Sequence, residues 1–197
     1  MYLREDYILI LCNFEKNITR GQNIFLSFLS YLFYTRGVFM KSKVKTYIIS
    51  ILIALAVGGL SALLTMGNMN LYGQIIKPPL SPPSFLFPVV WTVLFVLMGI
   101  SAAIIYNDRF ASMSEKRSAL YTYALSLFFN FFWSIIFFNA RAFLISFIWL
   151  LVLLFLIIRT IVKYHRISSL AAYLQIPYAF WVSFAGYLNF AIWWLNR

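Results

Sequence analysis

The sequence predicts an all-α polytopic membrane protein, a bundle of five transmembrane helices. Of its 197 residues, 63% are hydrophobic and only 11% are charged, which is far from the balance of a soluble domain. The apolar residues occur in runs of about 20, the length that crosses a hydrocarbon core roughly 30 Å thick. Because the runs show no alternation with a period of two, they indicate helices rather than membrane-spanning strands.

Each apolar run ends in a short loop that is charged or rich in Gly, Asn or Pro, so the limits of the helices can be placed approximately. We expect helices at about residues 47–66, 88–106, 118–138, 142–162 and 168–195. In the first helix, Gly58 and Gly59 allow close helix approach, and in the last, Pro177 predicts a kink. Residues 40–197 are therefore expected to form one membrane domain.

Residues 1–39 differ in character from the rest. Their longest apolar run, residues 24–34, is too short to cross a bilayer. Met40 is followed by three lysines and then a full-length apolar run, as at the start of many polytopic proteins. We expect Met40 to be the biological start and residues 1–39 to be a non-native or disordered extension. The alternative is a short helix lying on the membrane surface.

The net charge of +11 would suggest nucleic acid in a soluble protein, but here the basic residues lie in loops beside the spans. Counted from Arg36, ten Lys and Arg fall on one side of the membrane and three on the other. This bias predicts a cytoplasmic N-terminus, with the loop after the first span outside. The expected partners are membrane lipid and no nucleic acid.

Several kinds of site are not expected. Cys12 is the only cysteine and His165 the only histidine, so we expect no metal site and no histidine-based catalytic triad. No Asp, Glu or Lys lies in the middle of a span, which argues against an ion-coupled transporter. We find no internal repeat of the kind that builds many secondary transporters.

The stretch KPPLSPPSFLFPVVW, residues 77–91, holds five of the six prolines. Proline fixes φ and donates no backbone hydrogen bond, so the first four of them cannot lie inside a helix. We expect a stiff loop that acts as a lid over the bundle, with Pro78, Pro79, Pro82 and Pro83 as its lid residues. The alternative is a turn that only starts the next helix at Pro88.

Three helical faces combine aromatic rings with a few hydrogen-bonding groups at i, i+3, i+4 and i+7 spacing. If the faces converge, they form an apolar pocket with sparse polar groups, as is usual for a small-molecule site. The alternative is ordinary interior packing, with the amides bonding between helices. The faces are Trp91, Leu94, Phe95, Met98, Ala102 and Ile105; Tyr123, Ser126, Asn130, Trp133, Ser134 and Phe137; and Tyr178, Trp181, Ala185, Leu188 and Asn189.

Five motifs in order resemble the translocator protein family, also called the tryptophan-rich sensory proteins. The likeness covers about Met40 to Arg197, nearly a whole family domain. The matching residues are Lys77-Pro78 with Pro82-Pro83; Pro88-Val89-Val90-Trp91; Asn130-Phe131-Phe132-Trp133; Phe137-Phe138 with Ala140-Arg141; and Pro177-Tyr178 with Trp181, Phe184-Ala185 and Leu188-Asn189.

The resemblance implies a five-helix bundle with a pocket beneath its first loop. Members bind porphyrins and haem-like tetrapyrroles, sterols in animals, and synthetic isoquinolines and benzodiazepines, and bacterial members commonly form dimers. The family usually has Trp where this chain has Leu80, and often where it has Phe85, which weakens the expected loop contacts to a flat ligand. Phe190 replaces the Tyr of the animal sterol motif, so sterol transport is not predicted. The ligand-binding residues we expect are Trp91, Phe95, Asn130, Trp133, Tyr178, Trp181, Ala185 and Leu188.

We therefore predict a receptor or sensor for porphyrin or haem-like ligands in a bacterial cell membrane, with the tryptophans packing on the ligand and Asn130 hydrogen-bonding to it. Porphyrin or haem is expected as ligand rather than cofactor, and the protein as a homodimer. Two alternatives stay open: a light-dependent porphyrin-degrading enzyme with Trp133 and Trp181 as electron donors, and a passive porphyrin transporter.

Overall fold

The computed structural model describes the backbone of residues 24–197 and side chains from residue 43 onward. The chain divides into two compact units, Met1–Lys45 and Thr46–Arg197, and the second unit is the helical bundle. The expectation of an extension over residues 1–39 falls largely outside the described residues.

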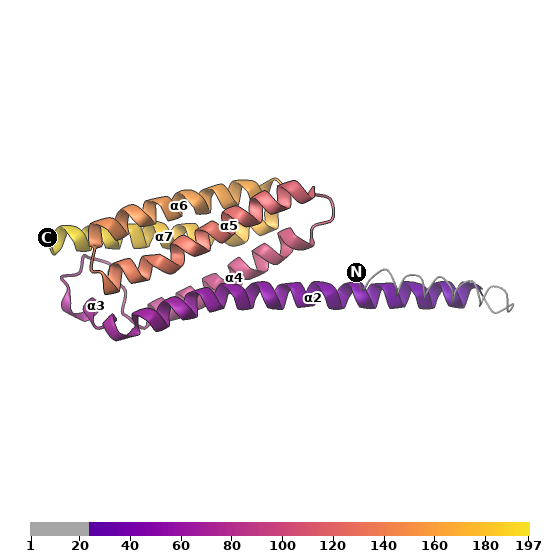
Figure 1. Ribbon diagram of the computed structural model, residues 1–197, viewed down its shortest axis with the longest axis horizontal. Coiled ribbons are helices and arrows are strands. Elements are labelled where there is room, and N and C mark those ends of the chain that lie inside the picture. Colours follow the sequence, from indigo (N-terminus) through magenta and orange to yellow (C-terminus); the bar gives the residue numbers. More distant parts are fainter. Residues whose placement is uncertain (1–23) are drawn as a thin grey trace. The chain divides into compact units, whose positions relative to one another are not determined.

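The described residues form helices and no strand, which confirms the predicted all-α class. Contacts pair α4 with α5 and α7, and α6 with α5 and α7, so these four helices lie side by side (Figure 1). The elements are α2 (Ile24–Thr65), the 3-10 turn η1 (Met66–Asn68), α3 (Leu71–Gln74), α4 (Leu86–Asn107), α5 (Met113–Ser134), the π-helical turn η2 (Ile135–Asn139), α6 (Phe143–His165) and α7 (Ser169–Leu195).

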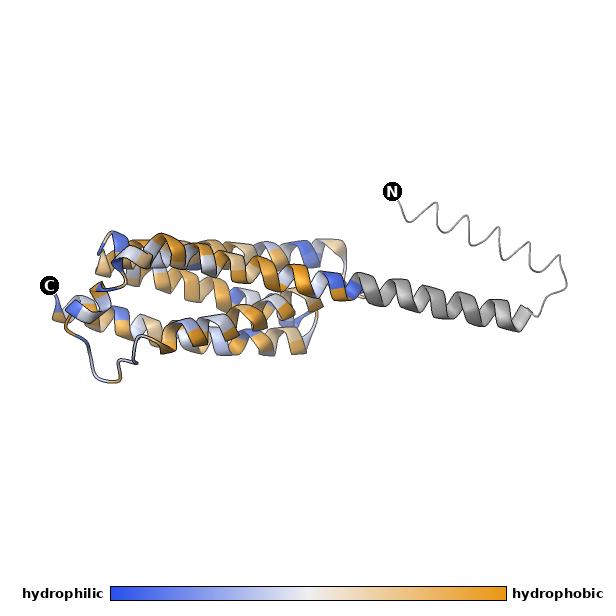
Figure 2. Cartoon of the chain, turned by 90° about the horizontal axis from the view of Figure 1, so that it is seen from below, coloured by the Kyte–Doolittle hydropathy of each residue, from blue (hydrophilic) through white to orange (hydrophobic). Residues whose placement is uncertain are grey.

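Four described helical segments are long and apolar enough to cross a membrane. They are Lys43–Asn68, Leu86–Asn107, Met113–Asn139 and Phe143–His165. Figure 2 shows hydrophobic residues along the helices of the bundle and hydrophilic ones concentrated toward its ends. The chain is thus an integral membrane protein. A fifth crossing by α7 stays a prediction, because its Tyr and Trp side chains and two amides make this 27-residue helix less apolar.

The first helix begins earlier than the sequence predicts. It starts at Ile24 rather than near residue 47, because residues 24–46 contain no proline and a single glycine, Gly37, so nothing in them stops a helix. The third predicted helix also starts earlier, at Met113. There the Ser112 side chain accepts from the Glu115 N–H and the Glu115 carboxylate accepts from the Ser112 N–H, a capping box whose S-x-x-E pattern is visible in the sequence.

Small residues set how closely α2 and α4 approach. A Cβ atom at Gly99 would lie 2.5 Å from the Ile51 Cα atom, so the two helices meet at backbone distance, as small residues allow in membrane bundles. Further along, the Ser61 hydroxyl donates to the Phe131 carbonyl over 2.8 Å. These contacts place the C-terminal half of α2 against α4 and α5.

The proline-rich loop between α3 and α4 is held from α7. The Asn196 amide both accepts from the Ile76 N–H and donates to the Ile76 carbonyl, each over 2.9 Å. The Tyr187 hydroxyl donates to the Pro79 carbonyl over 3.1 Å. Directly after Pro79, Leu80 has a φ of 68° and is 81% exposed. The first part of the loop therefore has a fixed backbone conformation, held by hydrogen bonds to residues at the C-terminal end of α7.

Candidate ligand-binding pocket

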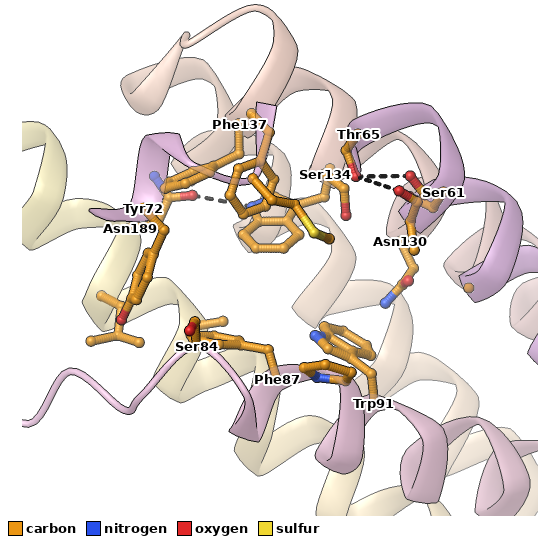
Figure 3. A pocket seen from close by; sticks show the side chains of 18 of the residues that line it. Ser61, Thr65, Tyr72, Ser84, Phe87, Trp91, Asn130, Ser134, Phe137 and Asn189 are labelled. Carbon is orange, nitrogen blue, oxygen red and sulfur yellow. Dashed lines mark hydrogen bonds between the residues drawn. The ribbon is translucent and has the colours of Figure 1, made fainter. Parts of the chain in front are cut away.

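A cavity of about 220 Å³ lies between α2, α4, α5 and α7, and Tyr72 of α3 also lines it (Figure 3). In this view Phe87 and Trp91 of α4 form its lower side, and Phe137 of the π-helical turn lies on the upper side. Within the described residues no group of three His, Cys, Asp or Glu side chains comes together. The chemistry of the cavity is thus that of aromatic rings, hydroxyls and amides.

The α4 wall is a pair of stacked rings. The Trp91 and Phe95 rings lie 5.5 Å apart with 28° between their planes, and both line the cavity. On the α2 side, a Cβ atom at Gly58 would lie only 2.0 Å from the Phe95 Cε2 atom. Gly58 therefore leaves the room in which the Phe95 ring lies flat beneath Trp91.

Asn130 of α5 supplies a hydrogen-bonding group to the cavity. Its amide nitrogen donates to the Tyr178 hydroxyl over 2.9 Å, and Tyr178 also meets the Trp91 ring edge-on at 6.1 Å. Asn130 is 5% exposed and Tyr178 1%. Because the amide nitrogen is engaged with Tyr178, the amide oxygen is the atom of Asn130 left to accept from a ligand N–H.

Trp133 is oriented by Asn189 of α7. The indole N–H donates to the Asn189 side-chain oxygen over 3.1 Å, and the Ser146 hydroxyl of α6 donates to the same oxygen over 3.0 Å. The Asn189 amide nitrogen donates to the Phe143 carbonyl over 2.7 Å. One amide thus joins three helices and holds a ring of the cavity wall.

Tyr72 of α3 lines the cavity and contacts the proline-rich loop. Its ring meets Phe87 edge-on at 5.3 Å, and its hydroxyl donates to the Pro82 carbonyl over 3.1 Å. Burial raises the pKa of the Tyr72 phenol, so the phenol stays a donor at neutral pH. The Lys77 ammonium lies 4.6 Å from the centre of the Tyr72 ring, a cation–π contact that places a positive charge beside a residue of the cavity lining.

The end of α5 unwinds into the π-helical turn Ile135–Asn139, a form often found at functional sites. Two of its residues, Phe137 and Phe138, line the cavity. Asn139 donates to the Leu64 carbonyl over 3.0 Å and accepts from the Asn68 amide over 2.9 Å. These bonds tie the turn to the end of α2.

The structure brings together most of the ligand-binding residues that the sequence suggests. Of those eight, the ones that line the cavity are Trp91, Phe95, Asn130, Trp133, Ala185 and Leu188. Tyr178 lies behind Asn130. Trp181 lies behind Phe87, with ring centres 5.9 Å apart, and its buried indole nitrogen has no partner.

Sequence reasoning did not place α2 in the cavity wall. Gly58, which the sequence predicts only to allow close helix approach, lines the cavity, and so does Ser61 one turn further along. Their small size, visible in the sequence, was the available signal. The four proposed lid residues Pro78, Pro79, Pro82 and Pro83 are not among the lining residues, whereas Ser84, Phe87 and Pro88 are.

Comparison with known proteins gives a consistent result. Residues 50–195 match the TspO/MBR family. The chain is 34% identical over 158 residues to the tryptophan-rich protein TspO of Chlorobaculum tepidum, covering 80% of this chain and 99% of that protein. It is 37% identical over 149 residues to the TspO protein of Archaeoglobus fulgidus, covering 75% and 94%. The bovine translocator protein is 31% identical over 141 residues, covering 71% and 83%.

Proposed function

The chain belongs to the TspO/MBR family of membrane proteins, and on that basis we propose that it is a receptor or sensor that binds a tetrapyrrole. Protoporphyrin and haem are the ligands to test first. The observation that carries this proposal is the cavity itself, in which aromatic walls surround very few polar atoms. Large flat hydrophobic molecules are the ligands that such a lining favours.

The aromatic walls supply most of the expected binding free energy. The stacked pair of Trp91 and Phe95 offers one flat surface. Trp133, fixed by its bond to Asn189, offers a second. Rings held in place before binding lose little conformational entropy when a ligand packs on them.

Two polar groups would orient the macrocycle. The free oxygen of Asn130 would accept from a pyrrole N–H in the middle of the cavity. Lys77, over the Tyr72 ring, would pair with a propionate carboxylate. The ligand would then lie with its apolar edge inward and its acidic edge toward the proline loop and the membrane surface.

The size of the cavity limits how a tetrapyrrole can bind. At about 220 Å³ it is smaller than the roughly 300–1,000 Å³ usual for ligand pockets. A tetrapyrrole would thus keep its propionate edge outside the cavity, or bind after a displacement of the proline loop.

The test is a titration of purified protein in lipid nanodiscs with protoporphyrin and with its dimethyl ester, followed by the absorbance of the porphyrin. We expect saturable binding of both. Lys77→Gln should weaken binding of the acid but spare the ester, and Asn130→Leu should weaken both. Trp149→Phe is the matched control, because the Trp149 indole donates to the Phe129 carbonyl and does not line the cavity. Non-saturable uptake, or equal effects of Trp149→Phe and Asn130→Leu, would contradict the proposal.

Light-dependent porphyrin degradation is the second candidate function. Its electron donors would be Trp133, which lines the cavity, and Trp181, whose ring packs behind Phe87. The same titration repeated under illumination separates binding from breakdown, because only breakdown bleaches the porphyrin irreversibly.

A further inference from the structure

The loop between α4 and α5, residues 108–112, carries an aromatic side chain at its tip. Phe110 is 99% exposed, and Met113 beside it is 78% exposed. The loop joins two segments that are each long and apolar enough to span a membrane, ending at Asn107 and beginning at Met113. Phe110 is therefore three residues from either span and stays at the level of the membrane surface.

The exposure of Phe110 follows from a fixed backbone conformation. The Asp108 side-chain oxygen accepts from the Phe110 and Ala111 N–H groups over 2.9 and 2.8 Å. The Lys116 ammonium donates to the Asp108 carbonyl over 2.9 Å. A turn held in this way presents its tip side chain outward without further conformational cost.

The surroundings of the loop are basic. Within the described residues its only acids are Asp108 and Glu115, and both carboxylates accept from groups of the loop itself. The bases on the loop and the start of α5 are Arg109, Lys116 and Arg117. At the same end, Lys163 of α6 donates to the Ser118 and Thr122 hydroxyls of α5, and Arg166 follows α6.

We propose that this loop is an anchor for the membrane surface, with anionic phospholipid of the surrounding bilayer as its partner. The Phe110 and Met113 side chains insert into the interfacial region. The Arg117 guanidinium group contacts anionic headgroups. Phe is among the side chains that interfacial segments bury at the headgroup boundary, and basic residues beside a span attract anionic lipid.

The short length of the loop favours the bilayer over a soluble protein partner. Five residues between two spans leave the ring no path away from the headgroup region, where lipid is always present. A partner from solution would have to displace that lipid to reach Phe110. The inference does not depend on the tetrapyrrole cavity, which is built from other residues.

The test measures the depth of the loop in nanodiscs. In a Cys12→Ser background, Phe110→Cys and the control Ser169→Cys are each labelled with a nitroxide. Ser169 is exposed at the same end of the bundle, at the start of α7. We expect the ratio of oxygen to nickel-chelate accessibility to be several-fold higher at position 110. Water-like ratios at both positions would overturn the proposal.

A second measurement places the nitroxide beside Phe110 rather than on it, by Met113→Cys. The accessibility ratio of this label is compared between the protein with Phe110 and the Phe110→Ser variant. It is also compared between zwitterionic and anionic nanodiscs. We expect a shallower label in the Phe110→Ser variant and a deeper label in anionic lipid, with the lipid effect reduced by Arg117→Gln. A depth that changes with neither Phe110 nor lipid charge would contradict the anchor. Unchanged melting temperatures verify that the variants fold.

Discussion

The indole N–H of Trp133 and the side-chain oxygen of Asn189 form a 3.1 Å hydrogen bond that joins the cavity wall to the helix interfaces. The same oxygen accepts from Ser146, so one amide orients a ring of the cavity and also holds α5, α6 and α7 together. Any change at Asn189 should therefore affect both ligand binding and stability.

Replacement of Asn189 should cost stability and affinity together. Asn189→Leu removes three interhelical hydrogen bonds. At about 0.6 kcal/mol for each, we expect a loss of roughly 2 kcal/mol, and weaker porphyrin binding because Trp133 is no longer fixed. Melting temperature and affinity are the measurements. Ser183→Ala is the control, since the Ser183 hydroxyl bonds only to its own helix. Wild-type values for Asn189→Leu would show that the amide is dispensable.

The helical class and most of the cavity wall could be predicted from the sequence, because both follow from local patterns. Runs of apolar residues mark spans, and the spacing of Trp91 and Phe95 marks a face. The exclusion of Trp181 could not be predicted in this way. Its spacing places it on the face of Ala185, but Phe87 from another helix occupies the space between Trp181 and the cavity, and only tertiary packing reveals such a neighbour.

The role of α2 illustrates a second limit. Gly58 is recognisable as a residue that permits close approach, but the sequence does not say what approaches. In the structure it is the Phe95 ring, 2.0 Å from where a Cβ atom would be. Likewise, the predicted face of Asn130 and Trp133 includes Phe137 but not Phe138, and both rings line the cavity where the helix widens into the π-helical turn Ile135–Asn139.

Gly58 should tolerate no side chain, whereas its neighbour should. Gly58→Ala forces the buried Phe95 ring to move and with it the stacked Trp91 ring. We expect a loss of about 1–3 kcal/mol in stability, as for other overpacked cores, together with weaker porphyrin binding. At Gly59 nothing lies within 4 Å of an added Cβ atom, so Gly59→Ala should be neutral or slightly stabilising. Equal melting temperatures for the two variants would refute this role of Gly58.

Added bulk at Ala185 should impair ligand binding directly. Ala185 is buried and lines the cavity, so Ala185→Leu fills space that a flat ring requires. An overpacking cost of about 1–3 kcal/mol corresponds to a roughly 5- to 150-fold loss of porphyrin affinity. Ser183→Leu, on the exposed side of the same helix, should cost much less. If Ala185→Leu lowers only the melting temperature and leaves affinity intact, the residue serves packing alone.

The orientation in the membrane can be tested at the tip of the proline loop. The ten-to-three excess of basic residues predicts that this loop faces outward. In a Cys12→Ser background, Leu80→Cys introduces a thiol at a strongly exposed position. We expect this thiol to react in intact cells with a membrane-impermeant maleimide. A thiol introduced by Ser81→Cys should react as well, but more slowly, because Ser81 is half-buried. Labelling that requires lysis of the cells would reverse the orientation.

Release of the loop from α7 should speed the entry of ligand. Asn196→Ala removes both hydrogen bonds to Ile76. The net worth of each such bond is about 1 kcal/mol, so the loss of both should make the open form of the loop roughly 30-fold more populated. The amide of Ile76 reports this directly, because its N–H donates to Asn196 and should exchange with deuterium faster once freed. If the ligand enters beside the loop, porphyrin association should accelerate in parallel, since the loop contacts Tyr72 of the cavity lining. Ser169→Ala, at the far end of α7, should alter neither rate. Faster exchange at Ile76 without faster association would mean that the ligand reaches the cavity by another path, between the helices.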